Sequence, residues 1–279
     1  MTEPVVPTRA AATARAVRVF AHRGASQERP ENTLAAFARA FEQGVDGSEL
    51  DVALSADGIP VVMHDETVDR TTNGSGAIET LTLEQLRALD AGGGQPVPTL
   101  DQVLALAVEH GAEINIEVKA ADAAAAVLDV VRRHEGLRWF ITSFHWPVLE
   151  EVRAADAAAR LYPLMLGVAD VERLRQEAIA AGHTAAQVAA HIEEVLRDSP
   201  IGLDEAVDFA VRIGAEGVSI WERDLIAADL TRIHAAGLLA WVWTVNDPAR
   251  AAELIRDGAD AICTDEPAEI LAVRAALRS

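Results

Sequence analysis

Residues 20–65 gather side chains that could carry out acid–base and metal chemistry within a short span. The stretch opens on His22 and closes on His64, with a Glu-x-Asp pair at Glu49 and Asp51 between them. Histidine changes charge near neutral pH and often acts as a general acid or base, whereas carboxylates bind hard cations. The stretch therefore predicts acid–base chemistry close to a divalent cation.

A second polar pair, Glu117 and Lys119, lies in a later apolar run. Side chains alternate along a strand, so Glu49 and Asp51 share one face, as do Glu117 and Lys119. Three converging carboxylates with no cysteine nearby are typical ligands of Mg²⁺ or Ca²⁺. A single such carboxylate is more often a surface group or a salt-bridge partner. Two polar pairs inside apolar strands favour a metal site, because buried charge is costly unless it is paired or bound to a metal.

Two cationic side chains and two histidines would surround an anion at this site. Arg23 offers a planar fork for bidentate binding of phosphate, and Lys119 adds a compact charge. His22 and His64 each follow an apolar run and fit a general base and a general acid. For either histidine alone, capping a strand is the commoner role, and His145 also follows a predicted strand.

Three further residues are candidates to support this site. Glu31 and Asn32 precede a predicted helix, where they fit two roles equally well, as helix caps or as groups that orient Arg23. Trp243 fits equally an apolar wall beside a leaving group and a packed residue of the core.

Alternating strand and helix patterns must position these groups. The patterns predict eight strands, each followed by a helix, and this number closes a (β/α)8 TIM barrel of the α/β class. The chain of 279 residues suits one such barrel of about 250 residues. The predicted strands are 17–22, 48–54, 113–119, 138–144, 160–166, 216–220, 238–245 and 260–265.

An additional apolar run, IPVVMHD at 59–65, follows the second strand after a short turn at Asp57-Gly58. A parallel crossover needs a dozen residues or more, so this run must return antiparallel as a hairpin. The return brings His64 to the end of the strand at which Glu49 lies. Sequence spacing alone thus predicts that a histidine and a metal ligand meet.

Three segments fall outside the alternation. Residues 1–16 contain no continuous apolar region and predict a mobile lead-in to a single domain at 17–279. Residues 66–97 are rich in glycine and polar groups, and they predict a small insertion over the mouth of the site. Residues 170–213 exceed a minimal crossover, and we interpret the excess as padding rather than as a lid or dimer contact.

Composition excludes several classes of partner. The net charge of −20 argues against nucleic acid, since phosphate backbones require a basic face. The single cysteine, Cys263, excludes an internal disulfide and suits a reducing compartment, so we expect a cytoplasmic protein. No apolar run reaches the roughly 20 residues of a membrane span. The sequence also has no basic amphipathic stretch, so we expect no stable membrane association. The oligomeric state is open.

Nine short motifs, in order from residue 21 to 267, resemble the glycerophosphodiester phosphodiesterase family, within the phospholipase C-like superfamily. No single motif is specific, but the set is. The motifs are AHRG (21–24), PENT (30–33), ELDV (49–52), DGIPVVMHD (57–65), DRTTNGSG (69–76), IEVK (116–119), SF (143–144), WTVND (243–247) and TDEP (264–267).

The resemblance implies a metal-dependent barrel that hydrolyses small glycerophosphodiesters to an alcohol and sn-glycerol 3-phosphate. Either water or the 2-hydroxyl of glycerol fits as the nucleophile. Ser48 and Ser55 depart from the family pattern, and neither is expected to contact phosphate. The resemblance implies that the cation is bound by Glu49, Asp51 and Glu117. It implies that His22 and His64 are the acid–base pair, and that Arg23 and Lys119 contact the phosphate.

Three rival functions fit parts of the pattern. A lysophospholipase D-like phosphodiesterase would accept a larger lipid alcohol, but aromatic residues make up only 4% of the chain. An aldolase-like barrel would use Lys119 as a Schiff-base nucleophile and would survive metal removal. A non-catalytic barrel that binds phosphodiesters or a partner protein would lack a histidine or a carboxylate, and all are present.

Overall fold

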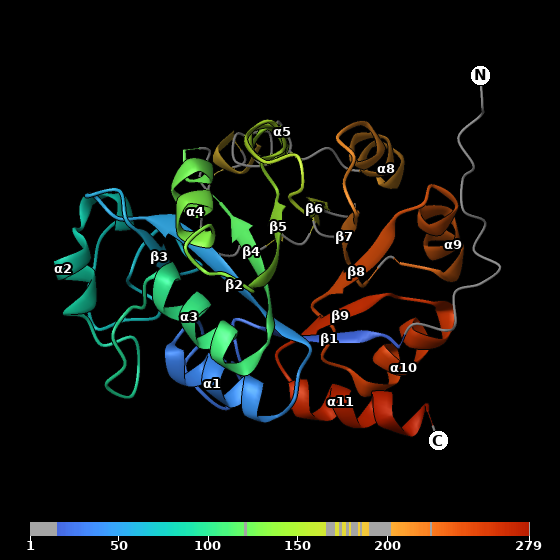
Figure 1. The fold of residues 1–279 in the computed structure, drawn as a ribbon, viewed down its shortest axis with the longest axis horizontal. Helices are drawn as coiled ribbons and strands as arrows, with labels where there is room; N and C mark the ends of the chain where they lie inside the picture. The colour runs from blue at the N-terminus through green and yellow to red at the C-terminus, as the bar shows by residue number, and fades with distance from the viewer. Residues whose placement is uncertain are drawn as a thin grey trace.

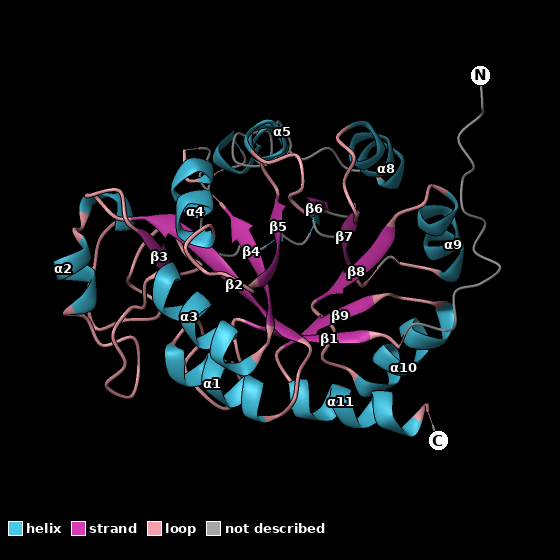
Figure 2. Ribbon diagram, viewed as in Figure 1, coloured by secondary structure: helices cyan, strands magenta, loops and turns pink. Residues whose placement is uncertain are grey.

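The computed structural model describes residues 16–119, 122–165, 202–223 and 225–278, together with 171–172, 175–176, 179, 184 and 186–189. Its strands gather in the middle of the molecule and its helices lie around them (Figures 1 and 2). The strands are β1 (Arg18–His22), β2 (Gly47–Leu54), β3 (Pro60–Val62), β4 (Glu113–Val118), β5 (Arg138–Ser143), β6 (Leu161–Met165), β7 (Gly217–Trp221), β8 (Leu239–Trp243) and β9 (Ala261–Thr264).

The helices alternate with the strands as the sequence predicts. Several start at a side-chain cap, such as Thr33 before α1 and Thr99 before α3, and α3 ends at a left-handed glycine, Gly111. The α-helices are α1 (Leu34–Glu42), α2 (Leu83–Arg87), α3 (Leu100–His110), α4 (Ala124–Val131), α5 (Trp146–Ala155), α8 (Leu203–Arg212), α9 (Ala227–Ala235), α10 (Pro248–Asp257) and α11 (Pro267–Ala276).

Eight strands form a closed parallel barrel. The order runs β1-β9-β8-β7-β6-β5-β4-β2, and β1 also pairs with β2, which closes the ring. This topology confirms the (β/α)8 barrel predicted from the strand count. In such barrels the carboxyl ends of all strands meet at one end, where loops can bring distant residues together.

The remaining strand, β3, lies outside the ring of eight and confirms the predicted hairpin. It pairs antiparallel with β2, with Val62 opposite Val52, along the edge that β1 leaves free beyond Glu49. The turn is closed by the backbone amide of Gly58, which donates to the carbonyl of Ser55 at 2.8 Å. One more ladder bond, from the amide of Met63 to the carbonyl of Asp51 at 3.0 Å, sets His64 beside the middle of β2.

The insertion, residues 66–97, carries a 3-10 helix (Ile78–Thr80) and α2, which lies at one side of the molecule (Figure 1). It has an apolar cluster of its own, which also includes Val61 of β3 and Met63 just after that strand. The buried members are Val61, Met63, Val68, Ile78, Leu86, Ala91 and Val97. The cluster anchors the insertion to the hairpin next to His64.

The amino-terminal end of the barrel is closed by aromatic and charged side chains. Phe20, Phe140, Tyr162 and Trp241 form a buried cluster inside the ring. Beyond it, Glu113 pairs with Arg18 at 2.7 Å and with Arg160, and the hydroxyl of Tyr162 donates to Glu216 at 2.9 Å. This end of the barrel is therefore filled by side chains whose charged groups are paired with one another.

Two predicted segments lie largely outside the described residues. The lead-in at 1–16 is described only at its last residue, and 170–213 is described mainly in α8. Among the described residues, no helix is long and apolar enough to cross a bilayer.

Gly24, the last residue of the AHRG motif, offers a test of how tightly the barrel mouth is packed. Its φ is +80°, and a Cβ placed there would lie 2.6 Å from the backbone of Ala36. Gly24→Ala should therefore lower the free energy of unfolding by roughly 2–4 kcal/mol, through strain and overpacking. The measurement is urea denaturation.

Gly58→Ala is the control, because Gly58 has a φ of +75° but nothing within 4 Å of the position that a Cβ would take. It should cost about 1 kcal/mol, which is the effect of the left-handed backbone alone. Equal losses in the two variants would contradict the packing argument.

Candidate active site

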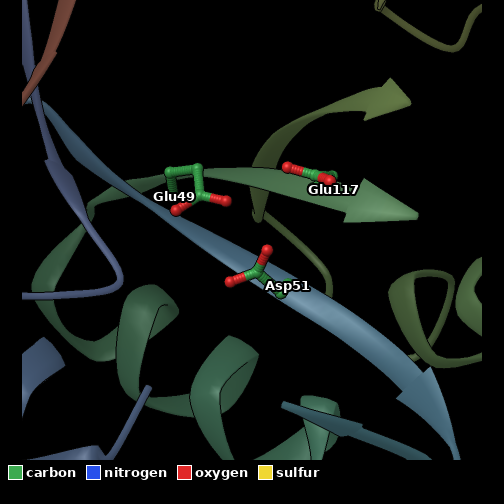
Figure 3. A group of neighbouring side chains, drawn as sticks. All are labelled: Glu49, Asp51 and Glu117. Carbon is green, nitrogen blue, oxygen red and sulfur yellow. The ribbon is translucent and has the colours of Figure 1, made fainter. Parts of the chain in front are cut away.

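Three carboxylates converge at the carboxyl end of the barrel. Glu49 and Asp51 project from β2 and Glu117 from the neighbouring strand β4 (Figure 3). Asp51 is paired in register with Glu117, and one oxygen of each of the three residues lies within 4.8 Å of the others. The structure thus brings together the three residues predicted as metal ligands.

The electrostatics of this cluster fit a hard cation. Glu49 is 3% exposed and Asp51 is 1% exposed. Burial, together with the negative charges of Asp51 and Glu117, raises the pKa of Glu49 well above its usual range. The cluster therefore carries more negative charge than its surroundings balance, and its donors are all carboxylate oxygens. That donor set suits Mg²⁺ or Ca²⁺.

Lys119 and Arg23 balance part of that charge. The Lys119 ammonium lies 3.1 Å from Asp51 Oδ1 and 3.0 Å from Glu117 Oε1. Burial by itself would lower the pKa of Lys119, but the two carboxylates outweigh it and raise that pKa. Burial likewise opposes the charge on Asp51, yet Lys119 and Arg23 hold its pKa far below the usual range. Both cations stay charged and face the carboxylates.

The backbone at Arg23 and Asn32 is folded tightly around the site. Both residues adopt left-handed conformations, with φ of 58° and 56°. The amide of Arg23 donates to Glu49 Oε2 at 3.1 Å, and the Asn32 side-chain amide donates to Asp51 Oδ2 at 2.9 Å. Strained backbone of this kind persists where the surroundings enforce it, often at functional sites.

The two roles left open for Glu31 and Asn32 are separated by these contacts. The cap of α1 is Thr33, whose hydroxyl accepts from the amide of Ala36. Glu31 instead accepts from Arg23 Nη1 at 2.9 Å, so it orients the arginine. Asn32 acts on Asp51, and its Oδ1 is buried with no hydrogen-bond partner among the described residues.

His22 lies at the carboxyl end of β1, between two acidic residues. Its Nδ1 is 2.7 Å from Asp265 Oδ1, and its Nε2 is 3.9 Å from Glu49 Oε2. Asp265 also accepts from the Ser26 hydroxyl at 3.1 Å and from the Asn246 side-chain amide at 2.6 Å. Burial opposes ionisation of Asp265, but the bonds from its neighbours lower its pKa to about 2.

His64, like His22, has its Nδ1 next to an aspartate. Its Nδ1 is 2.6 Å from Asp65 Oδ1. Burial is the main cause that lowers the pKa of His64, and the charges of Lys119 and Arg23 add to it against the opposing effect of Asp51. The neutral imidazole is therefore favoured in the protein without a bound ligand.

Arg70, from the insertion, links the two halves of the site. Its guanidinium donates to both oxygens of Asp65, at 2.6 and 2.8 Å, and to both oxygens of Glu31, at 2.8 and 2.9 Å. The bonds from Arg70 hold the pKa of Asp65 far below its usual range. A continuous chain of polar contacts thus runs from His64 through Arg70 and Glu31 to Arg23.

Trp243 ends β8 and is half-buried in a row of aromatic rings. Its ring meets those of Phe144, at 5.6 Å between centroids, and Trp221, at 4.9 Å, edge to face in both cases. The guanidinium of Arg223 lies 5.6 Å from the Trp221 ring. Trp243 therefore packs against aromatic neighbours and also keeps part of its surface exposed, as an apolar wall would.

Arg70, Asn246 and Asp265 contribute to the site although sequence reasoning assigned them no role. Each belongs to a motif that carries the family resemblance, DRTTNGSG, WTVND and TDEP respectively. Motif membership was therefore the available signal. Arg70 has one partner nearby in sequence, Asp65, but the contacts Arg70–Glu31, Asn246–Asp265 and Asp265–His22 span 39, 19 and 243 residues, so only the folded barrel identifies them.

Comparisons with known proteins place these motifs in one family. A model of the glycerophosphoryl diester phosphodiesterase family matches residues 22–269. A glycerophosphodiester phosphodiesterase of Caldanaerobacter subterraneus subsp. tengcongensis is 34% identical over 260 residues, covering 91% of this chain and 96% of that protein.

Solved structures agree. An Oleispira antarctica phosphodiesterase in complex with the product sn-glycerol-3-phosphate superposes with a TM-score of 0.75 and 28% identity, over 94% of this chain and 97% of that one. A glycerophosphodiester phosphodiesterase from Thermotoga maritima gives a TM-score of 0.72 and 26% identity, over 92% and 98% of the two chains.

The charge imbalance at the carboxylates makes a testable prediction about Glu49. Glu49→Gln removes a buried carboxyl group whose ionisation is opposed by burial and by two neighbouring carboxylates, so it should stabilise the cation-free protein by roughly 1–2 kcal/mol. The same change removes a carboxylate ligand, so Mg²⁺ or Ca²⁺ should no longer raise the thermal midpoint. Thermal unfolding with EDTA and with each cation measures both effects.

Glu113→Gln is the matched control, since Glu113 is also buried in a strand but pairs with Arg18 and Arg160. This substitution should destabilise the protein and leave its response to cations intact. A Glu49→Gln protein that is less stable than the wild type in EDTA, or that still responds to cations, would contradict the metal assignment.

Proposed function

Because the chain belongs to the glycerophosphoryl diester phosphodiesterase family and is a phosphoric diester hydrolase, we propose that it cleaves glycerophosphodiesters to an alcohol and sn-glycerol 3-phosphate with one divalent cation, Mg²⁺ or Ca²⁺. The observation that carries the proposal is the convergence of three carboxylates beside His22 and His64. The product in the Oleispira antarctica structure supports the choice of product.

The proposed ligands of the cation are Glu49, Asp51 and Glu117. When bound, the cation supplies Lewis-acid stabilisation of the charge that develops on the phosphate oxygens. Arg23 and Lys119 contribute permanent positive charge at the same place, and their existing carboxylate partners hold them in position. A negatively charged phosphodiester fits this arrangement better than a neutral ligand would.

The proposed acid–base pair is His22 and His64. One imidazole removes a proton from the nucleophile, either water or the glycerol 2-hydroxyl. The other, protonated at Nε2, donates that proton to the oxygen of the departing alcohol. Each ring is held through Nδ1 by an aspartate, Asp265 and Asp65, so each offers Nε2 to the reaction. In this proposal Trp243 lies at the mouth, where the alcohol would leave.

Two of the rival functions fit these contacts less well. A Schiff-base lysine must lose its proton to become a nucleophile, but two carboxylates raise the pKa of Lys119. A non-catalytic barrel has no need of two imidazoles held by ionised aspartates. A lysophospholipase D-like activity shares the same chemistry and differs only in the alcohol, so it is separated by assay. The cytoplasmic location also stays a prediction.

A substrate and metal panel tests the proposal. Glycerophosphocholine, glycerophosphoethanolamine and lysophosphatidylcholine are assayed for glycerol 3-phosphate or lysophosphatidate after EDTA treatment and after Mg²⁺, Ca²⁺ or Mn²⁺ is restored. We expect EDTA to reduce turnover of the glycerophosphodiesters by about 10²-fold or more, with recovery on adding a cation. Turnover that survives EDTA, or a preference for lysophosphatidylcholine, would overturn the metal role or the substrate class.

Single substitutions test the acid–base pair. His22→Ala and His64→Ala should each reduce kcat by about 10²–10⁴-fold, because a positioned proton acceptor or donor is lost. Both variants should still bind the cation, which is measured as a rise in the thermal unfolding midpoint when the cation is added. His110→Ala, in a helix remote from the carboxylates, is the control and should retain full activity. Near-normal turnover by either active-site variant would sink its assigned role.

A further inference from the structure

The closure of the barrel places Asp265 beside His22. Strand β9 pairs in parallel with β1, with Thr264 opposite Ala21, so the next residues on each strand emerge as neighbours. On its other side β1 pairs with β2, with His22 opposite Glu49. His22 therefore stands between Asp265 and the carboxylate cluster, and its two ring nitrogens face different partners, at 2.7 and 3.9 Å.

The hydrogen bonds around Asp265 have a defined polarity. Asn246 Oδ1 accepts from the backbone amide of Asp265 at 2.9 Å and from the Thr264 hydroxyl at 3.1 Å. Its amide nitrogen must therefore point at Asp265 Oδ2, 2.6 Å away. The Asp265 position must consequently present an acceptor to Asn246, and an ionised carboxylate can present a second acceptor to His22.

We propose that Asp265, oriented by Asn246, is a positioning residue that holds His22 as the Nδ1–H tautomer and so leaves the Nε2 lone pair in the site. This inference rests on the proposed role of His22 as an acid–base group. A carboxylate has no proton to donate when ionised, and its pKa of about 2 keeps Asp265 ionised at neutral pH. Nδ1 must then be the donor across the 2.7 Å contact.

Asp265→Asn tests the polarity. The Asn246 side chain keeps its orientation, so the new side chain turns its carbonyl to Asn246 and its NH₂ to His22 Nδ1. His22 should then shift to the Nε2–H tautomer. We expect kcat to fall by about 10²–10⁴-fold with little change in KM, because Asp265 touches no proposed phosphate ligand. Histidine ¹⁵N correlation spectra of the Mg²⁺-loaded protein, assigned with His22→Ala, report the tautomer.

Exchanging the two side chains provides the rescue. In the double variant Asp265→Asn with Asn246→Asp, the carboxylate at 246 accepts from both former donors and from the new amide. The carbonyl at position 265 is then free to face His22. The Nδ1–H tautomer should return, and kcat should recover by about tenfold or more over the single variant. A role for Asp265 in fold stability alone predicts no such recovery.

Asp247→Asn is the matched control. It removes the same charge one residue from Asn246, and asparagine caps a helix as well as the aspartate that now accepts from the Ala249 amide at 2.9 Å. It should leave kcat and the His22 tautomer unchanged. The wild-type spectrum is a test in itself, needing no folded variant, and an Nε2–H tautomer there would overturn the inference.

The outcomes separate this inference from the proposed function. Activity in His22→Ala would refute the acid–base role and, with it, the reason for a positioning residue. An inactive His22→Ala together with an Asp265→Asn enzyme that keeps the Nδ1–H tautomer and works as well as Asp247→Asn would refute only the role of Asp265.

Discussion

Mutual repulsion among three carboxylates at the barrel mouth is the constraint on which the rest of the site depends. Two of them are almost fully buried, and burial of unpaired charge is costly. Arg23 and Lys119 offset part of this cost, because each forms an ion pair with Asp51. Glu49 receives only a backbone amide within hydrogen-bond distance among the described residues, so the remaining imbalance is directed to the point where a cation and a phosphate would meet.

The two histidines share one arrangement but differ in how it is supported. Asp265 is held by the neutral groups of Asn246 and Ser26, whereas Asp65 is held by the charged guanidinium of Arg70. The barrel itself supplies the first support and the insertion supplies the second. The insertion is therefore part of the polar framework of the site, as well as an apolar layer on the hairpin.

Much of the fold was predictable because it follows from local patterns. Strand count, the parallel ring and the β2–β3 hairpin depend on hydrophobic periodicity, connection length and the Asp57-Gly58 turn, all readable in short windows. The grouping of Glu49, Asp51 and Glu117 followed from side-chain alternation within strands. The sequence could not decide whether Glu31 caps the helix or orients Arg23. That choice depends on Thr33 being the N-cap of α1 and on the Arg23 guanidinium reaching Glu31.

The contact between His22 and Asp265 joins the first and last strands of the barrel at the site. The carboxylate cluster needs only β2 and β4, so the groups proposed to hold the cation come from the first half of the chain. The partner of His22 arrives with the ninth and last strand. The groups proposed to hold the cation and the group that contacts His22 thus come from opposite halves of the chain. In this proposal, competence for catalysis depends on the pairing of β1 with β9 that closes the barrel.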